Sequence, residues 1–299
     1  HVLVENGGSE DGAGLDVRST GPVTVRDSEI RGSRNFGVSV DRNARLRTFS
    51  GNGVTDNAEP VEVTASNVRD IAADNALTGN DTDRLHVLAS IDYVIPEGQS
   101  HTWADPGVPL FLTQNRNTFR VEGDLTLSPG IELRVDQGNG IFVTGSLNAS
   151  IPDTDLPSEG PIESPPESAI TFRGAQATAG YWQGVMYSNT ASQDNVLSGA
   201  VIRHAGSDPA GRGIYQEPAA LSVLTGSRVT VDGALVEEND GYGLFVNKDN
   251  ELQTVARTRI RDNADPAQVF FTTVPALATS SDYTGNDTDR VEVSLDLRE

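Results

Sequence analysis

Short segments of this chain alternate between apolar and polar residues, as in the run Val-Thr-Val at 229–231. Alternation with a period of two is typical of a strand that buries one of its faces. Gly, Asn and Asp fill the intervals between these segments, and such residues favour tight turns. Amphipathic stretches with helical spacing and caps are absent. The pattern therefore predicts an all-β protein.

The predicted strands recur at intervals of about 23 residues. Two series with this spacing are Val17, Val40, Val63 and Leu221, Leu244, Ala267. A parallel β-helix needs such a period, because each coil buries its inward side chains only by stacking on the next coil. We therefore predict a right-handed parallel β-helix solenoid with three short strands per coil of about 23 residues, in about a dozen coils. The side chains expected to point inward include Val40, Val63, Val246 and Val269.

A longer repeat is superimposed on the coils. The string Thr-Gly-Asn-Asp-Thr-Asp-Arg occurs at 78–84 and again at 284–290, an offset of 206 residues. The same offset relates 23–25 to 229–231 and 56–58 to 262–264. We therefore expect residues 1–89 to be the C-terminal coils of one β-helix unit of 206 residues, and residues 90–299 to be one nearly complete second unit.

One turn of the coil has an asparagine signature. An apolar residue is followed three places later by Asn in the pairs Leu3/Asn6, Val54/Asn57, Val236/Asn239 and Ile260/Asn263. Asn tolerates a positive φ and hydrogen-bonds neighbouring backbone groups through its side chain. The signature predicts a ladder of stacked asparagines along the rod.

Charge and composition narrow the range of partners. The chain carries 43 acidic and 22 basic residues, a net charge of −21 at pH 7. A nucleic-acid partner needs a basic surface, so this class is excluded. The apolar runs fall short of the 18 or so residues that a membrane span requires. Cys is absent, which excludes disulfides and cysteine-bound metals.

The repeated turn at 80–83 and 286–289 offers paired carboxylates, from Asp81 with Asp83 and from Asp287 with Asp289. Two carboxylates in a turn led by Gly present several oxygens to one side, so Ca²⁺ is a candidate ligand, and the only candidate cofactor. The alternative is a plain Asx-type turn that leads into the next strand. Arg84 and Arg290 then provide ion-pair partners for these carboxylates. A third carboxylate facing the turn would favour calcium.

The order of short motifs from residue 90 onwards points to a known group of proteins. The segments are 102–103 (Thr-Trp), 125–131 (Leu-Thr-Leu-Ser-Pro-Gly-Ile), 145–149 (Gly-Ser-Leu-Asn-Ala), 169–172 (Ala-Ile-Thr-Phe), 180–185 (Gly-Tyr-Trp-Gln-Gly-Val) and 200–206 (Ala-Val-Ile-Arg-His-Ala-Gly). Together they resemble right-handed parallel β-helix proteins of the pectin-lyase-like class. More narrowly, they resemble the β-helix repeat units of large bacterial secreted and cell-surface proteins. The resemblance implies the fold, but fold alone does not define an activity.

Polysaccharide lyases and hydrolases share this fold, so carbohydrate chemistry is the alternative to a structural role. Trp103, Tyr181 and Trp182 are candidates for stacking on sugar rings, or else they pack at a coil edge. None of the four histidines is flanked by glycines, as a pectin hydrolase would require, and Arg259-Ile260-Arg261 resembles the basic motif of those enzymes only superficially. The sequence gives no catalytic constellation.

Two proline-rich stretches, 150–168 and 207–219, interrupt the coils, and we expect them to protrude as loops. Insertions of this kind often form the binding face of a solenoid. The sequence favours a structural or adhesive segment of a long extracellular or cell-surface protein, such as a stalk, fibre or adhesin. Its expected partners are neighbouring repeat units or protomers. The alternative is a carbohydrate-active module, for which acidic or arginine side chains converging beside the protruding loops would be the sign.

Overall fold

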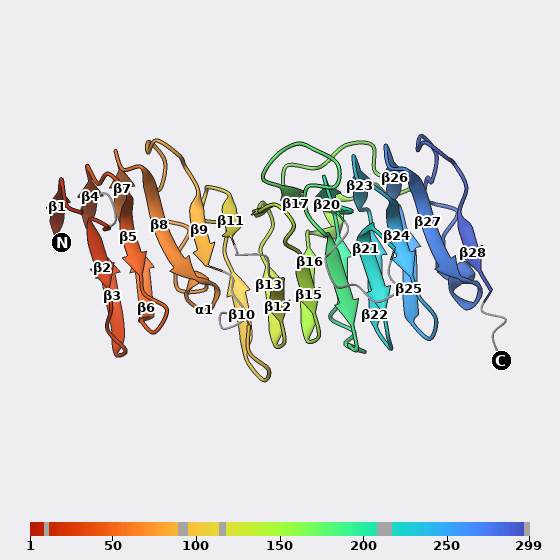
Figure 1. The fold of residues 1–299 in the computed structure, drawn as a ribbon, viewed down its shortest axis with the longest axis horizontal. Coiled ribbons are helices and arrows are strands. Elements are labelled where there is room, and N and C mark those ends of the chain that lie inside the picture. Colours follow the sequence, from red (N-terminus) through yellow and green to blue (C-terminus); the bar gives the residue numbers. More distant parts are fainter. Residues whose placement is uncertain (9–11, 89–94, 114–117, 208–216, 296–299) are drawn as a thin grey trace.

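The structure, a computed structural model, describes residues 1–8, 12–88, 95–113, 118–207 and 217–295. The chain winds into a parallel β-solenoid of about 11 turns. The first and last strands of the described chain, Leu3–Glu5 and Glu292–Ser294, lie at opposite ends of the resulting rod (Figure 1). This confirms the predicted fold class and the three strands per coil. No helix in the described ranges is long and apolar enough to cross a membrane.

One parallel sheet of ten strands runs along most of the rod. Its strands, in spatial order, are β2 (Leu15–Val17), β5 (Phe36–Val40), β8 (Glu59–Thr64), β9 (Leu85–Leu88), β11 (Leu110–Thr113), β14 (Glu132–Val135), β17 (Ile170–Gly174), β20 (Ala200–Arg203), β23 (Leu235–Glu237) and β26 (Arg259–Arg261). It is the only sheet of the described part of the chain with strands from both predicted units.

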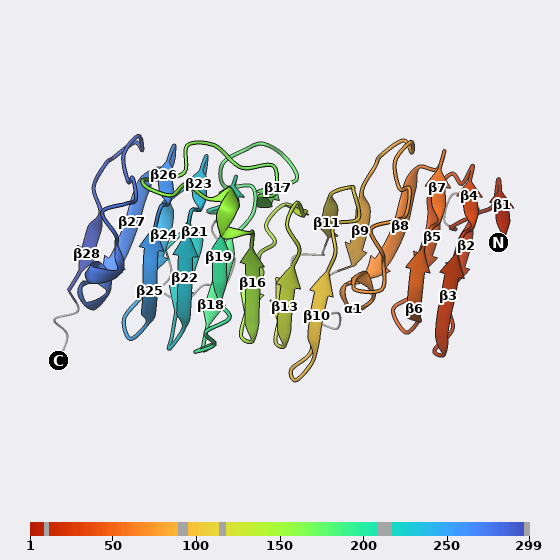
Figure 2. The same ribbon diagram turned by 180° about the vertical axis from the view of Figure 1, so that it is seen from behind.

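The remaining sheets belong to one part of the chain each. The N-terminal part contains a sheet of β1 (Leu3–Glu5), β4 (Glu29–Arg31) and β7 (Gly53–Thr55), and another of β3 (Pro22–Arg26) and β6 (Arg45–Ser50). The later part contains a seven-stranded sheet of β12 (Phe119–Val121), β15 (Ile141–Val143), β18 (Val185–Ser188), β21 (Ala219–Leu224), β24 (Tyr242–Val246), β27 (Asp265–Phe270) and β28 (Glu292–Ser294). Its six-stranded sheet is formed by β10 (Ser100–Trp103), β13 (Asp124–Leu127), β16 (Ser146–Ser150), β19 (Val196–Ser198), β22 (Arg228–Asp232) and β25 (Glu251–Ala256), which lie side by side in Figure 2. Three short helices complete the described elements: α1 (Ala65–Val68), η1 (Asp153–Asp155) and η2 (Phe271–Ala276).

The core is a continuous column of apolar side chains, mostly aliphatic with some aromatic rings, enclosed by the sheets. Because successive side chains of a strand point to opposite faces, every second residue enters this column. Val40, Val63, Val246 and Val269 are all buried in it, as predicted. Aliphatic burial of this kind supplies the main favourable free energy of the fold.

The predicted asparagine ladder is present. The side-chain amide of Asn239 donates to Asn263 Oδ1 at 2.8 Å, and that of Asn263 donates to Asn286 Oδ1 at 3.0 Å. In the first copy the side chain of Asn57 donates to Asn80 Oδ1 at 3.1 Å. Each amide therefore satisfies groups of the neighbouring coil as well as its own.

Two details of that prediction were wrong. The positive φ falls on the residue before the ladder position, as at Asp56, Glu238 and Asp262, where a short turn needs the left-handed conformation. Asn6 is itself such a residue, with φ 52°, and lies outside the ladder. The reason is the register: Val4, not Leu3, pairs with Ile30, so Asn6 stands one position earlier than the spacing suggested.

Backbone geometry repeats at the offset of 206 residues. The pairing of β3 with β6 contains an irregularity between Val23 and Thr24, and the pairing of β22 with β25 contains one between Val229 and Thr230. Val63 pairs with Val87, and Val269 pairs with Val293. The predicted boundary between residues 89 and 90 lies outside the described residues.

The second copy is nevertheless rotated about the rod axis. β5 and β8 lie in the ten-stranded sheet, whereas their equivalents β24 and β27 lie in the seven-stranded sheet. Conversely, β4 and β7 lie in a sheet of their own, whereas their equivalents β23 and β26 lie in the ten-stranded sheet. Over 206 residues the chain therefore completes a whole number of coils and then one further side of the rod. Equivalent strands consequently lie in different sheets and face different directions.

Candidate functional site

Outward-facing arginines form a row on the later half of the ten-stranded sheet. The register aligns, on successive strands, Arg134, Arg173, Arg203, Glu237 and Arg261. The row forms because alternate residues of these strands, such as Phe172 and Ile202, enter the core. We call Arg134, Arg173, Arg203 and Arg261 the arginine row. It concentrates positive charge on the surface of a strongly acidic protein.

Two carboxylates hold the arginine row in place. Glu132 accepts from Arg134 Nε at 2.7 Å and lies 3.6 Å from Arg173 Nε. Glu237 is almost fully buried and accepts from Arg203 Nε at 2.8 Å and from Arg261 Nε at 2.9 Å. The hydrogen bond from Arg261 to Glu237 raises the pKa of this guanidinium. Arg261 also lies 3.5 Å from Asp262 Oδ2. Glu132 and Glu237 are thus each shared by two arginines of the row.

A buried histidine follows Arg203 in the turn. His204 Nε2 lies 3.2 Å from Glu238 Oε2, while its Nδ1 has no partner among the described residues. Burial lowers the pKa of His204. The contact with Glu238 acts to raise it, while the charges of Arg173 and Arg203 lower it further, so the net shift is downward. Next to this turn, Tyr181 donates its hydroxyl hydrogen to Asp136 at 3.3 Å.

The loop 150–168 lies against the same sheet, beside the arginine row. Ile162 donates its backbone N–H to Arg257 O at 2.8 Å and packs with Val201 and Leu235. Arg259 forms a 2.7 Å ion pair with Glu163. The loop therefore leaves the coil, as expected, but folds back onto the outer face. Of the other predicted loop, 207–219, residues 208–216 lie outside the described part of the chain.

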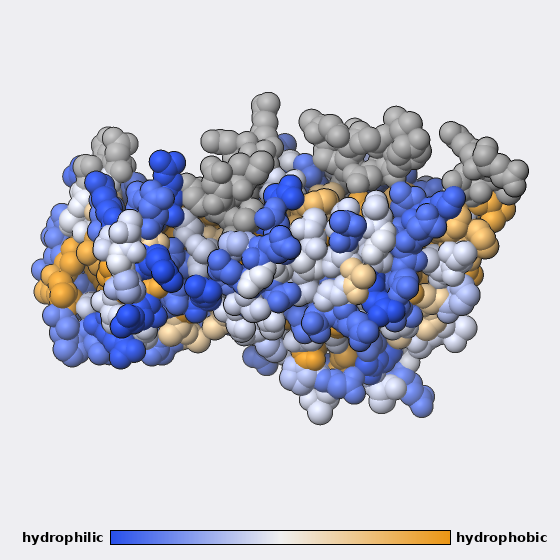
Figure 3. Space-filling model, turned by 90° about the horizontal axis from the view of Figure 1, so that it is seen from below, coloured by the Kyte–Doolittle hydropathy of each residue, from blue (hydrophilic) through white to orange (hydrophobic). Residues whose placement is uncertain are grey.

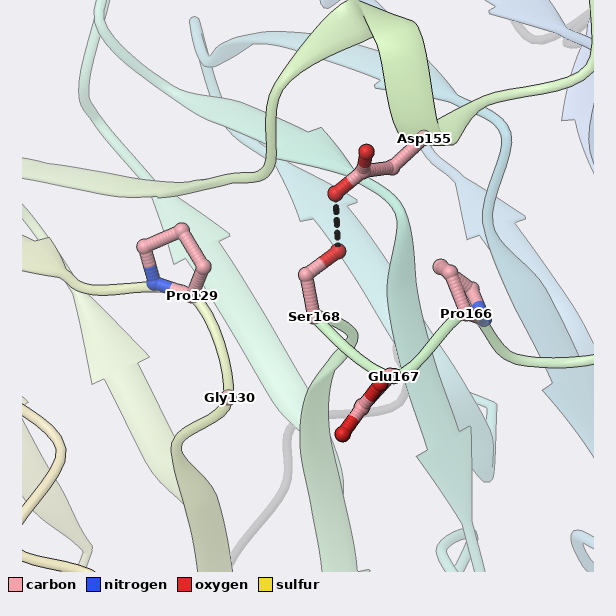
Figure 4. A pocket seen from close by; sticks show the side chains of 6 residues that line it. All are labelled: Pro129, Gly130, Asp155, Pro166, Glu167 and Ser168. Atoms are coloured by element: carbon pink, nitrogen blue, oxygen red, sulfur yellow. Dashed lines mark hydrogen bonds between the residues drawn. The ribbon is translucent and has the colours of Figure 1, made fainter.

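A shallow depression of about 550 Å³ lies where this loop meets the turn at Pro129 and Gly130. Ser168 Oγ donates to Asp155 Oδ2 at 2.6 Å, whereas the carboxylate of Glu167 points away from this pair (Figure 4). The two carboxylates that line the depression do not converge. The arrangement thus lacks the facing acid pair that glycoside cleavage uses.

The predicted calcium turns have the geometry of Asx turns. Asp83 accepts from the backbone N–H groups of Asn80 at 2.8 Å and Gly79 at 3.1 Å, and Asp289 accepts from that of Asn286 at 2.9 Å. Burial acts to raise the pKa of Asp83, but these hydrogen bonds outweigh it and lower the pKa. The described residues contain no group of three or more His, Cys, Asp or Glu side chains arranged for a metal.

Arg84 pairs with a different carboxylate from those expected. Its guanidinium binds Glu59, with Nη2 2.6 Å from Oε1, and lies over the ring of Phe111 at 4.0 Å. Strand pairing explains this, because β9 lies between β8 and β11 and brings Arg84 beside both residues.

The predicted glycan contacts are not accessible at the two tryptophans. Trp103 is fully buried and stacks on Phe119, with ring centroids 5.7 Å apart. Trp182 is fully buried, and its indole N–H donates to Arg203 O at 2.7 Å. Neither presents a ring face to a sugar, so the alternative of packing holds for both. Tyr181 is partly exposed, next to Trp182 and close to the arginine row.

Sequence reasoning missed the arginine row because its members are separated by unequal intervals, and only the register across the insertion at 150–168 aligns them.

Comparisons of the chain with family models, with curated proteins and with solved structures gave no match.

Proposed function

We propose that this chain is a rigid β-helical segment of a long repetitive extracellular or cell-surface protein, where it serves as a stalk, fibre or adhesin. Its resemblance to the β-helix repeat units of large bacterial surface proteins supports this assignment. The observation that carries it is the unbroken ten-stranded sheet. Val63 pairs with Val87, and Val87 pairs with Leu112, so the hydrogen-bonded ladder passes from the first copy into the second.

Such a ladder resists bending. Bending between the units would have to break parallel strand pairs and expose aliphatic side chains to water. The high negative charge supports the same role, because like-charged rods repel one another and stay apart in solution. The neighbours of the segment are further repeat units or protomers.

Small-angle X-ray scattering and thermal unfolding test this proposal together. A rigid segment gives the distance distribution of one straight rod and a single cooperative transition. A flexible two-part shape, or separate melting of residues 1–89 and 90–299, would contradict it. Leu110→Asp is the informative variant, because Leu110 is buried and pairs with Leu85 across the joint between the units. It should convert the single transition into two.

A glycan-binding function is the second candidate, and the arginine row favours it. Guanidinium groups bind carboxylates and sulfates in planar, two-point geometry. Adjacent strands place Arg134, Arg173 and Arg203 about 4.8 Å apart, close to the length of one sugar residue in a linear chain, whereas Glu237 lies between Arg203 and Arg261. A linear acidic polysaccharide would fit along the row, beside the loop 150–168. Binding, rather than cleavage, is the activity that this arrangement supports.

Binding of a linear polyuronate, with a neutral glucan for comparison, tests this second candidate. Arg173→Gln is the variant of choice, because Arg173 has the looser contact with Glu132 and its loss strands no buried carboxylate. We expect roughly tenfold weaker binding, as for one charge-assisted contact. Arg120→Gln is the matched control, since Arg120 pairs with Glu122 on a different sheet. Equal binding by both variants, or equal affinity for the neutral glucan, would rule this function out.

A further inference from the structure

The two copies end in equivalent coils that differ in exposure. In the first copy, Ala65, Val68 and Val87 are 0%, 1% and 0% exposed. Their equivalents 206 residues later, Phe271, Val274 and Val293, are 50%, 39% and 45% exposed. The backbone is the same, because Val87 pairs with Val63 as Val293 pairs with Val269. The last coil of the second copy therefore carries apolar side chains at the positions of a buried interface. No further coil of the described chain packs on them.

The first copy shows what the cover is. β11 pairs with the edge of β9 that faces away from β8, which places Leu110 beside Leu85 and Leu112 beside Val87. The coil that contains β11 also carries Trp103 and Phe119 into the core. The cover is thus the coil that contains β11, described over residues 95–113 and 118–121.

The exposed apolar residues of the described chain concentrate at the two ends of the rod. The large ones are Val2, Leu3, Phe271, Val274, Val293 and Leu295. Figure 3 shows hydrophobic residues at both ends. An unpaired parallel edge with exposed apolar side chains is a template for a further strand. The outer edge of β28 combines both features.

We propose that the end formed by η2 and β28 is an interface for a further copy of the coil that contains β11, from another unit of the same kind. The proposal rests on the proposed function as a repetitive rod and identifies its contact surface. In this interface a strand equivalent to β11 pairs with β28 in the register that β11 has with β9. The seven-stranded sheet then runs through the joint, as the ten-stranded sheet does in the chain described.

An extended chain tests the interface. Residues 94–299 are joined directly after Glu299, which preserves the offset of 206 residues. Amide hydrogen exchange of Glu292–Ser294 should be slower in the extended chain than in the 299-residue chain by roughly a hundredfold or more, because the edge becomes a central strand. Equal exchange in both chains would overturn the proposal.

Val293→Asp provides a second readout. In the 299-residue chain the substitution places a charge at an exposed position and should leave the melting temperature nearly unchanged. In the extended chain it buries that charge and should lower the melting temperature of the coils around the new joint by several degrees. Val2→Asp, at the opposite end, is the matched control and should be tolerated in both chains. Equal tolerance of Val293→Asp in both would contradict the interface.

The two proposals fail in different ways. A flexible 299-residue chain in scattering would contradict the rod, whereas unchanged exchange at β28 in a straight extended chain would contradict only the interface.

Discussion

The two copies agree in their backbone and core and differ on their outer faces. At the end of the first copy, Arg84 and His86 both contact Glu59, with His86 Nδ1 3.3 Å from Oε2. The ring of His86 also lies edge-on between Phe36, at 5.2 Å, and Phe111, at 5.6 Å. This cluster covers the outside of the joint between the units.

The equivalent positions of the second copy have other chemistry. Glu292 replaces His86 and accepts a hydrogen bond from Tyr242 at 2.8 Å, and Asp265 replaces Glu59 and accepts one from Thr288. Burial and the hydrogen bond to Glu292 raise the pKa of Tyr242. The inward valines and the asparagine ladder are common to both copies. The coil therefore depends on its inward and turn residues, while outward residues are free to diverge.

The largest expected effect comes from breaking what the copies share. Val40→Asp and Val246→Asp each place an unpaired charge in the core, because both valines are buried at equivalent positions. Each should lower the free energy of unfolding by at least about 3 kcal/mol. Denaturant titration measures the loss, and Thr230→Asp, on the outward side of β22, is the control. A melting temperature unchanged by either valine substitution would mean that the strand faces the other way.

Substitutions in the asparagine ladder should show a smaller effect, a difference in the loss of unfolding free energy between the two copies. Asn263 lies between Asn239 and Asn286, whereas Asn57 lies between Ser33 and Asn80. Asn57→Ala should cost about 2 kcal/mol, and Asn263→Ala about 1 kcal/mol more, because the latter also removes the acceptor of a neighbouring amide. Equal losses in chemical unfolding would show that the contact between ladder side chains adds nothing.

Acid should affect the joint of the first copy through Glu59. Burial acts to raise the pKa of Glu59, but hydrogen bonds from His86 and Arg84 outweigh it and lower the pKa from 4.5 to about 2. Since the folded-state pKa lies below the unfolded one, the stabilisation is present above pH 4.5 and is lost as the pH falls towards 2.

Unfolding free energy measured against pH tests this. The wild-type curve should fall more steeply through that window than the curve of Glu59→Gln, which lacks the titrating group. Arg84→Gln removes one of the two donors and should give an intermediate slope. Parallel curves for the three proteins would exclude a contribution from this ion pair.

The repeated Asp turns should give the smallest effect. Asp83→Ala and Asp289→Ala should each cost about 1 kcal/mol or less, with the larger loss at Asp83, which accepts from two backbone N–H groups. Millimolar Ca²⁺ should leave the melting temperature of the wild type unchanged. A rise that the double substitution Asp287→Ala and Asp289→Ala abolishes would show that the turns bind calcium instead, because a ligand of the folded state alone must stabilise it.

The fold was predictable because its signals are local and periodic. Spacings of about 23 residues place Val40 and Val63 on one inward row, and stacking is the only way for such short strands to bury them. The ladder was predictable for the same reason. The rotation of the second copy was not predictable. A repeat offset counts residues, whereas the number of sides of the rod that those residues cover depends on insertions such as 150–168.

The surface sites were less predictable. Sequence placed Trp103 and Trp182 correctly within the coils but could not say which way their rings point, and both enter the core. Arg84 pairs with a residue 25 positions away, on the neighbouring coil, rather than with its own turn. The arginine row depends on register across coils of unequal length. Side-chain contacts between coils require exact strand alignment, which periodicity gives only approximately.

The rotation by one face also determines how the rod would meet its surroundings. A feature carried once per unit, such as the turn ending at Asp83 or Asp289, points in a new direction in each successive copy. A flat target could therefore touch only some of the copies at once, which limits the avidity that repetition alone would provide. When two rods lie side by side, only some of the copies in each rod present the same surface feature to the neighbouring rod. Continuous lateral association of identical units is therefore disfavoured. A lattice of targets surrounding the rod, by contrast, could be engaged from every side.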